Sequence, residues 1–262
     1  MTVYINDISV IGPGLIDKEI TCSILLGEKN WIYQEMPKLI PDMLPANERR
    51  RTTPMIRLAL ACIQGLSSDH NDLQTTSTVF ASSDGDFEIS DKICSALSKD
   101  EKIISPTLFH NSVHNSAAGY WSIASLIKGA STSLSAGNAT FMSGLQEAVT
   151  QVEVDGGTVL FVAYDYPAPS PLNEYCHIKY PLAIAIRIGK TAENKALGTL
   201  TLEGQENDIK DSVCRNLSLE PLRLASPVGD GMPLIEALVR RARMQVIIPY
   251  LGDRKFRISI SH

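Results

Sequence analysis

The sequence predicts an α/β fold in which a mixed sheet is covered by helices. Short apolar segments alternate along the chain with longer segments whose apolar residues recur at helical spacing. Residues 158–163, Thr-Val-Leu-Phe-Val-Ala, form a continuous apolar run, which is typical of a strand buried on both faces. The 262 residues, 44% hydrophobic and 20% charged, suit a globular protein and argue against disorder.

The strands follow from local patterns. Residues 2–11 end at Gly12-Pro13-Gly14 and predict a strand followed by a turn. We expect a sheet of about five strands and two extended segments in the less regular tail. The segments are 2–11, 78–81, 132–135, 158–163, 182–188 and 197–202, with 245–248 and 255–261 in the tail.

The helices follow from spacing and from their ends. Residues 54–66 have apolar side chains at helical spacing, and Pro54 suits a first turn. A helix over 116–128 is expected to end at Gly129. Further helices are expected at 88–98, after Asn138 until Gly156-Gly157, and at 233–244.

Composition excludes several classes of function. The net charge of −5 argues against general binding of nucleic acid. The five cysteines are scattered without metal-ligand spacing, so we expect reduced thiols in a cytoplasmic protein. The first residues do not resemble a signal peptide, and no apolar run is long enough to span a membrane.

Residues 133–148 are the most informative segment, because they predict a strand end, a sharp turn and a buried helix with Asn138 at its start. A helix N-terminus presents unpaired N–H groups, which lower the pKa of a cysteine placed there and make it a nucleophile. The carboxamide of Asn138 cannot hold an acyl group as a thioester. Since Asn is a preferred N-cap residue, we expect Asn138 to cap this helix.

Three segments together resemble β-ketoacyl synthases: Arg49–Leu66, Phe109–Gly119 and residues 131–149. The separation of Gly119 from Asn138 is similar to the family's separation of a glycine from its catalytic cysteine. The resemblance covers residues 1–203 and implies the N-terminal half of a thiolase-like fold. It implies a ketosynthase-like domain over 1–203, with 204–262 as an extension packing on the same domain.

The departures from the family define the function that the resemblance implies. Asn138 replaces the cysteine, and only His177 and His262 follow it, neither in the His-Gly-Thr or Gly-rich motif that completes a ketosynthase site. The pattern is similar to the short chain length factors of aryl polyene and other type II polyketide systems. This implies a cofactor-free, non-catalytic subunit that pairs with a full-length β-ketoacyl synthase and meets acyl carrier protein through that complex.

The resemblance also implies an interface. Family members pair through the strand before the nucleophile turn, which corresponds to Thr132, Ser133, Leu134 and Ser135. Positions near the partner's acyl tunnel correspond to Leu108, Phe109, Ser112 and Val113, whose bulk would set the accepted chain length. The alternative is a stand-alone hydrolase or transferase of acyl thioesters. It lacks a Gly-x-Ser-x-Gly motif, since Ser143-Gly144 falls inside the predicted helix.

Two further groups of residues could form a metal site or a catalytic site. His110 and His114 are four residues apart and could share a metal, but no third ligand lies nearby in sequence. We therefore predict no metal site and a hydrogen-bonding role at a subunit interface. Four residues at strand ends, which are Asp84, Asp86, Tyr164 and Asp165, are interpreted as caps and turn formers without a catalytic role.

Overall fold

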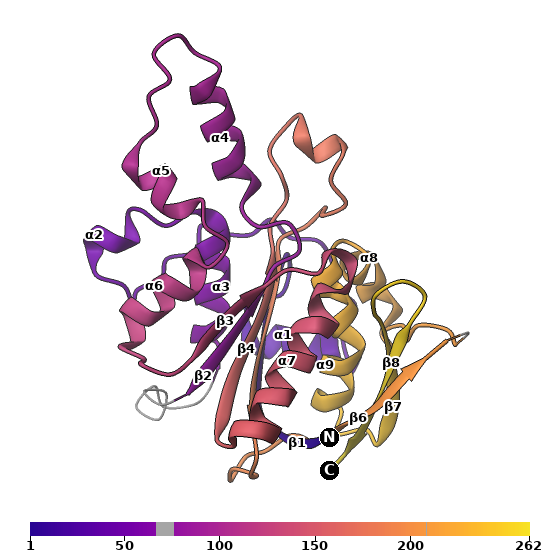
Figure 1. Cartoon of the computed structure of the whole chain (residues 1–262). Helices are drawn as coiled ribbons and strands as arrows, with labels where there is room; N and C mark the ends of the chain where they lie inside the picture. Colours follow the sequence, from indigo (N-terminus) through magenta and orange to yellow (C-terminus); the bar gives the residue numbers. More distant parts are fainter. Residues whose placement is uncertain (67–75, 208) are drawn as a thin grey trace.

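The computed structural model describes residues 1–66, 76–207 and 209–262, and its eight described strands form one mixed sheet (Figure 1). Across the sheet the order is β3 (Ser131–Leu134), β2 (Ser77–Ala81), β4 (Thr158–Asp165), β5 (Leu182–Gly189), β1 (Thr2–Ile11), β6 (Gly198–Glu206), β8 (Lys255–Ser261) and β7 (Met244–Pro249). The pairs β3–β2 and β2–β4 are parallel and the others antiparallel. The predicted α/β class is confirmed.

The expected number of about five strands is wrong, because the tail continues the same sheet. β6 pairs with β1 on one side and with β8 on the other, and β8 pairs with β7. On β8 the residues Phe256, Ile258 and Ile260 are buried while their neighbours are half-exposed. This period of two places one face of the strand on the core, which is why the tail is a sheet element and not a separate unit.

The described helices are α1 (Lys18–Leu26), α2 (Ala46–Arg49), α3 (Pro54–Gln64), α4 (Phe87–Leu97), α5 (Pro106–Asn111), α6 (Ser116–Ser125), α7 (Thr140–Asp155), α8 (Glu220–Arg223) and α9 (Met232–Val239). α3 begins as predicted, with Pro54 in its first turn and the hydroxyl of Thr53 accepting from the N–H of Ile56. α1, capped by Asp17, was not predicted.

Two helix ends differ from the prediction. α6 ends at Leu126, which adopts a left-handed conformation with φ 56°, and Gly129 lies beyond it. A Cβ at Gly129 would lie 2.5 Å from the carbonyl oxygen of Thr76. This glycine therefore permits two backbone segments to approach closely and does not terminate a helix. α9 ends at Val239, because Met244 already begins β7.

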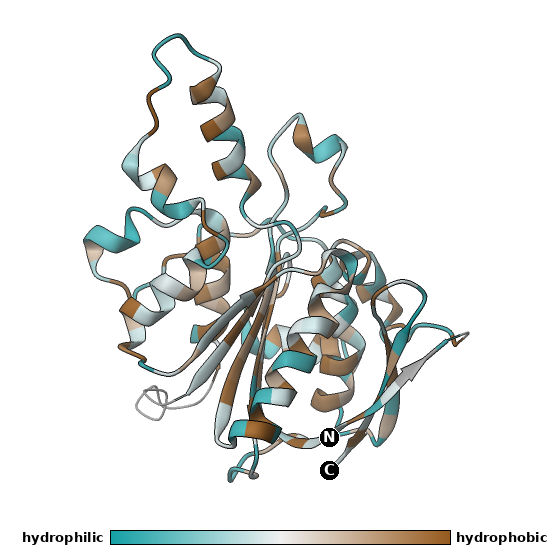
Figure 2. Ribbon diagram, viewed as in Figure 1, coloured by the Kyte–Doolittle hydropathy of each residue, from teal (hydrophilic) through white to brown (hydrophobic). Residues whose placement is uncertain are grey.

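The two faces of the sheet bury separate apolar cores. On one face α3 and α6 pack against Phe80, Leu160 and Val162. On the other face α7 and α9 pack against the alternate side chains of β1, β4 and β5. β4 contributes to both cores, and all of its residues after Thr158 are buried, as its apolar run predicted. Figure 2 shows the apolar strands and helix faces meeting at these cores.

The C-terminal segment covers the sheet face that carries α7. In Figure 1, β6, β8 and β7 curve around α9, which lies beside α7. All residues from Met232 to Leu238 of α9 are buried, so this helix is enclosed on every side. A Cβ at Gly231 would lie 2.3 Å from the ring of Phe141 on α7, so the close packing at the start of α9 requires a glycine.

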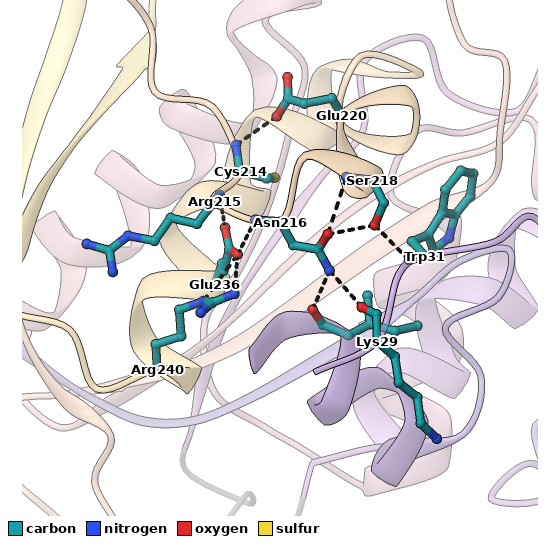
Figure 3. Close-up of polar contacts among 10 residues, drawn as sticks. Lys29, Trp31, Cys214, Arg215, Asn216, Ser218, Glu220, Glu236 and Arg240 are labelled. Atoms are coloured by element: carbon teal, nitrogen blue, oxygen red, sulfur yellow. Dashed lines mark hydrogen bonds and ion pairs between the residues drawn. The ribbon is translucent and has the colours of Figure 1, made fainter. Parts of the chain in front are cut away.

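A buried polar cluster holds the C-terminal segment to α1 and α9 (Figure 3). The carboxylate of Glu236, 1% exposed, accepts from the N–H groups of Arg215 and Asn216 and pairs with Arg240. The Asn216 amide donates to the carbonyls of Ile24 at 2.8 Å and Lys29 at 2.9 Å. These contacts satisfy buried polar groups that would otherwise cost about 1–3 kcal/mol each.

Candidate functional site at the edge of the sheet

The turn between β3 and α7 is held by hydrogen bonds that do not involve Asn138. The hydroxyl of Ser135 donates to the carbonyl of Ser83 at 2.6 Å and ties the turn to the end of β2. The hydroxyl of Thr140 donates to the carbonyl of Gly137 at 2.7 Å and accepts from the N–H of Ala136 at 3.0 Å. Gly137 has φ 54°, so the turn requires the left-handed conformation that glycine adopts without strain.

Asn138 is exposed in the short 3-10 turn Gly137–Ala139 that precedes α7. The predicted capping role is wrong, because the N-cap of α7 is Ala139 and no side chain caps this helix. Thr140 stabilises the turn from the first helical position instead, which leaves the carboxamide of Asn138 without a hydrogen bond among the described residues. The side chain is neither a nucleophile nor a structural anchor.

No histidine of the described residues is placed to act as a base at this turn. His177 is exposed in the loop after β4, and the ring of His262 contacts the carbonyl of Leu197 at the far end of the sheet. The Nε2 atom of His114 lies 3.2 Å from the carbonyl oxygen of Ser82, and the ring of His110 packs edge-on against Tyr120. Among the described residues, none of these rings hydrogen-bonds to residues 135–140.

The predicted tunnel residues lie on and just after α5, which projects from the body of the molecule together with α4 (Figure 1). Phe109 is 69% exposed and Val113 52% exposed, whereas Leu108 is half-buried. Ser112 is exposed, and its hydroxyl donates to the carbonyl of Phe109 at 2.8 Å. Large apolar side chains therefore face solvent where the chain resembles a family interface.

The predicted pairing strand lies at the edge of the sheet. β3 spans Ser131–Leu134, one residue earlier than expected, and pairs with β2 alone among the described strands. The carbonyls of Ala130 and Leu134 accept from β2, so the alternation of a parallel ladder directs the N–H and C=O groups of Ser131 and Ser133 away from β2. These two residues expose an edge on which a further strand can pair.

Small side chains from β3 and α6 surround a hollow of about 450 Å³ beside this edge. The small residues are Ala118, Gly119, Ser122, Ser131 and Ser133. A Cβ at Gly119 would have nothing within 4 Å, so no neighbour in this chain requires a glycine there. A surface built from small residues permits close approach by another backbone.

The residues at the strand ends act largely as predicted. Asp86 caps α4 by accepting from the N–H of Ile89 at 3.2 Å. Asp165 is fully buried and accepts from both the N–H and the hydroxyl of Ser83. Burial raises the pKa of Asp165 to about 7, although the hydrogen bonds from Ser83 act in the opposite direction. Burial also raises the pKa of the Tyr164 hydroxyl.

Metal binding and membrane crossing find no support in the described part of the chain. His110 and His114 make unrelated contacts, and no group of three His, Cys, Asp or Glu side chains there could hold a metal ion. Among the helices described, none is long and apolar enough to cross a membrane. All five cysteines are free, and burial raises the pKa of Cys62 to about 12.

Sequence reasoning missed two features of the site. The bond from Ser135 to Ser83 and the clamp of Ser83 on Asp165 join the ends of three neighbouring strands, β3, β2 and β4. Both serines are ordinary in sequence. The only available signal was their position immediately after predicted parallel strands, where side chains from neighbouring strands meet.

Comparisons with known proteins identify the fold. A family model described as "Beta-ketoacyl synthase, N-terminal domain" matches residues 27–222. No curated protein matches the sequence. A chain of the ketosynthase ApeO in complex with its chain length factor ApeC, from Xenorhabdus doucetiae, is similar with a TM-score of 0.74 and 23% identity, over 99% of both chains.

Two further structures support the same fold. A chain of the ishigamide ketosynthase/chain length factor is similar with a TM-score of 0.73 and 13% identity. A chain of AntDE:AntF, a type II acyl carrier protein in complex with its ketosynthase, is similar with a TM-score of 0.70 and 11% identity. Each match covers 99% of both chains. These likenesses confirm the predicted thiolase-like ketosynthase fold.

Proposed function

The chain belongs to the β-ketoacyl synthase N-terminal domain family, and from this membership we propose that it is a non-catalytic chain length factor. It would form a heterodimer with an active β-ketoacyl synthase and shape the acyl tunnel of that partner. Condensation of acyl chains on acyl carrier protein would take place at the partner's cysteine. The pathway would be of the type II polyketide or aryl polyene kind, as the likeness to the complex of ApeO and ApeC supports.

The observation that carries this proposal is the turn at Asn138. The strand, turn and buried helix are present, but the position of the nucleophile holds an exposed carboxamide without a hydrogen bond among the described residues. Thr140 and Ser135 keep the turn in place. A preserved turn without a nucleophile supports a structural role for this part of the molecule, namely to present β3 and α7 to a partner.

The edge strand supports pairing with another chain. Ser131 and Ser133 direct backbone groups outward, and the hollow beside them is lined by small side chains. Pairing through this edge would extend the sheet into the partner. The exposed Phe109 and Val113 would then be buried at the junction, where their bulk could limit the length of the partner's tunnel.

The C-terminal segment packs on the same sheet as the rest of the chain. We propose that residues 204–262 are an extension of the 1–203 domain and not a domain of their own. β8 and β7 continue the sheet and enclose α9, so the core that carries α7 is covered by the chain itself.

A stand-alone hydrolase or transferase has weaker support. Ser143, the first serine after the turn, lies inside α7. A Cβ on the next residue, Gly144, would lie 2.5 Å from the ring of Phe161, so this helix is packed tightly against β4 and does not form a strained nucleophile turn.

Co-expression tests the proposal. The chain is purified alone and together with a ketosynthase encoded beside it, and mass is measured by light scattering. We expect a stable one-to-one complex that condenses acyl chains, and self-association or poor solubility of the chain alone. A well-behaved monomer that hydrolyses or transfers acyl thioesters without a partner would contradict the proposal.

A further inference from the structure

A second pocket lies apart from the turn at Asn138, between the start of α3, the start of α4 and the segment that joins α5 to α6. Its volume is about 120 Å³, which is room for about four waters or for one small polar group. Polar residues from three segments line it, namely the β2–α4 connection, the α5–α6 connection and β4. Among these residues are Asp84, Asp86, His114 and Tyr164.

Three polar atoms of this pocket are free to accept hydrogen bonds. Asp86 uses Oδ1 to cap α4, whereas its buried Oδ2 has no partner among the described residues. Tyr164 is 2% exposed, and its hydroxyl has no hydrogen-bond partner in the described part of the chain. His114 must donate from Nε2 to the carbonyl of Ser82, so Nδ1 of the neutral ring is left as an acceptor.

Three other side chains on the same walls direct their donors elsewhere. The hydroxyl of Ser90 donates to the carbonyl of Asp86, and the hydroxyl of Ser112 donates to the carbonyl of Phe109. The amide of Asn111 donates to the carbonyl of Arg51 at 2.7 Å and accepts from the hydroxyl of Tyr120. The pocket therefore offers three free acceptors, although the hydroxyls of Ser116 and Tyr164 can also donate, and this arrangement suits a ligand rich in N–H bonds.

The charged side chains that line the pocket are both carboxylates, those of Asp84 and Asp86. No lysine or arginine lines it. Burial raises the pKa of Asp86 and the neighbouring carboxylate of Glu88 acts in the same direction, although the side chain of Thr53 and the N–H of Ile89 act against them. Burial also raises the pKa of Tyr164, and the carboxylates of Asp165 and Asp86 act in the same direction. Lys92 lies nearby on α4 but pairs with Glu88. A bound cation would relieve this negative potential.

We propose that this pocket binds a guanidinium or primary ammonium group. Asp86 and Asp84 supply the opposite charge, and the oxygen of Tyr164 and Nδ1 of His114 accept further N–H bonds. The described residues contain no set of three metal-ligating side chains, so an organic cation fits better than a metal ion. The group can come from a free small molecule or from an arginine or lysine side chain of the partner.

The first experiment is an NMR titration of the full chain that follows the histidine ring signals. Methylguanidinium is the probe, and N-methylurea, of similar shape but neutral, is its control. We expect methylguanidinium to shift the His114 signal in a saturable manner, and N-methylurea to leave it unchanged. The His114 signal is identified by its loss in His114→Asn.

Variants test the assignment of the pocket. Asp86→Asn, which can still cap α4, and Tyr164→Phe should each raise the dissociation constant of methylguanidinium about tenfold. Asp91→Asn removes one charge from the same helix outside the pocket and should leave binding unchanged. If methylguanidinium fails to bind the folded wild-type chain, or if Asp91→Asn weakens binding as much as Asp86→Asn, the assignment is wrong.

Repeating the titration on the complex with a co-purified ketosynthase distinguishes the two sources of the cation. Only the partner source rests on the proposed function. A partner side chain in the pocket would exclude methylguanidinium from the complex, and Asp86→Asn would lower the yield of complex. A small-molecule site would bind methylguanidinium in the complex as in the free chain. If no complex forms, the proposed function fails. The titration of the free chain then still decides whether the pocket binds an organic cation.

Discussion

The buried carboxylate of Asp165 is held by Ser83, which donates to one oxygen from its backbone N–H and to the other from its hydroxyl, both at 2.8 Å. Ser83 follows β2, and Asp165 is the last residue of β4. The carbonyl of Ser83 also accepts from Ser135 at the end of β3. This contact therefore fixes the ends of three parallel strands from which the turn at Asn138 begins.

Stability should fall as the pH rises from about 4 to 7. Burial raises the pKa values of Asp165 and Asp230 to about 7 in the folded chain, above their usual value near 4. The folded state therefore binds more protons in this window, and the unfolding free energy falls by up to about 4 kcal/mol for each group. Urea unfolding at several pH values measures this slope.

Asp165→Asn should reduce that slope, because an amide keeps an acceptor for the N–H of Ser83 and does not titrate. Asp165→Asn combined with Asp230→Asn should reduce it further. Asp91→Asn, on the half-exposed face of α4, serves as the control and should leave the slope unchanged. An unaltered slope in the double variant would show that other groups control the acid dependence.

Proline on β3 should separate partner binding from folding. Ser133→Pro removes an N–H that the ladder directs outward, so we expect the free energy of unfolding to change by less than about 1 kcal/mol while complex formation falls at least tenfold. Thr132→Pro removes an N–H directed at β2 and should destabilise the chain itself. Thermal unfolding and co-purification with a ketosynthase measure the two effects. If the Ser133→Pro variant forms the complex with the ketosynthase normally, the proposed interface through β3 is wrong.

Leu108→Ala combined with Phe109→Ala should lengthen the products of the partner ketosynthase. Phe109 is 69% exposed in the free chain, so its truncation should not disturb the core. A smaller side chain at the junction leaves more room for an acyl chain, and each added methylene contributes about 1–3 kcal/mol of discrimination. Mass spectrometry of products reads the length, with Val154→Ala, also highly exposed, as the control. Unchanged product lengths would show that Leu108 and Phe109 do not shape the partner's acyl tunnel.

Asn138→Cys should give an accessible thiol but no condensation by the chain. Asn138 is exposed, so the new cysteine should react with iodoacetamide faster than the buried Cys62. No described histidine contacts the turn to assist decarboxylation. An assay with acyl and malonyl carrier protein measures turnover. Condensation by the purified variant would show that a competent site exists in this chain.

Asn216→Asp should destabilise the chain by about 3 kcal/mol. It replaces an amide that donates to the carbonyls of Ile24 and Lys29 with a carboxylate that repels them. Asn173→Asp, at an exposed position, should change the free energy of unfolding by less than about 0.5 kcal/mol. Urea unfolding compares the two. Equal effects would mean that the amide of Asn216 does not hold α1 to the C-terminal segment.

The sequence predicted the elements whose patterns are local. The strand over 158–163 and the start of α3 follow from an apolar run and from Pro54 in a first turn, and both are found. The end of α6 could not be foreseen, because Leu126 adopts a left-handed conformation that its side chain does not favour.

The site was predictable in outline only. The position of Asn138 before a buried helix was foreseen from the small residues around it. Its predicted capping role was wrong, because Thr140 makes the hydrogen bonds of the turn instead. The pairing of Ser83 with Asp165 joins residues 82 positions apart. Such contacts depend on the order of strands in the sheet, which local sequence does not encode.

The position of β1 inside the sheet has a consequence for the timing of folding. Its neighbours are β5 and β6, so Tyr4 pairs with Gly189 and Thr2 with Thr201. During synthesis β1 therefore waits unpaired until β5 and β6, more than 170 residues further along, leave the ribosome. Pairings so distant in sequence fold slowly, and the apolar β1 is exposed to aggregation in the meantime. Chaperone demand during translation should accordingly depend on the exposure of β1.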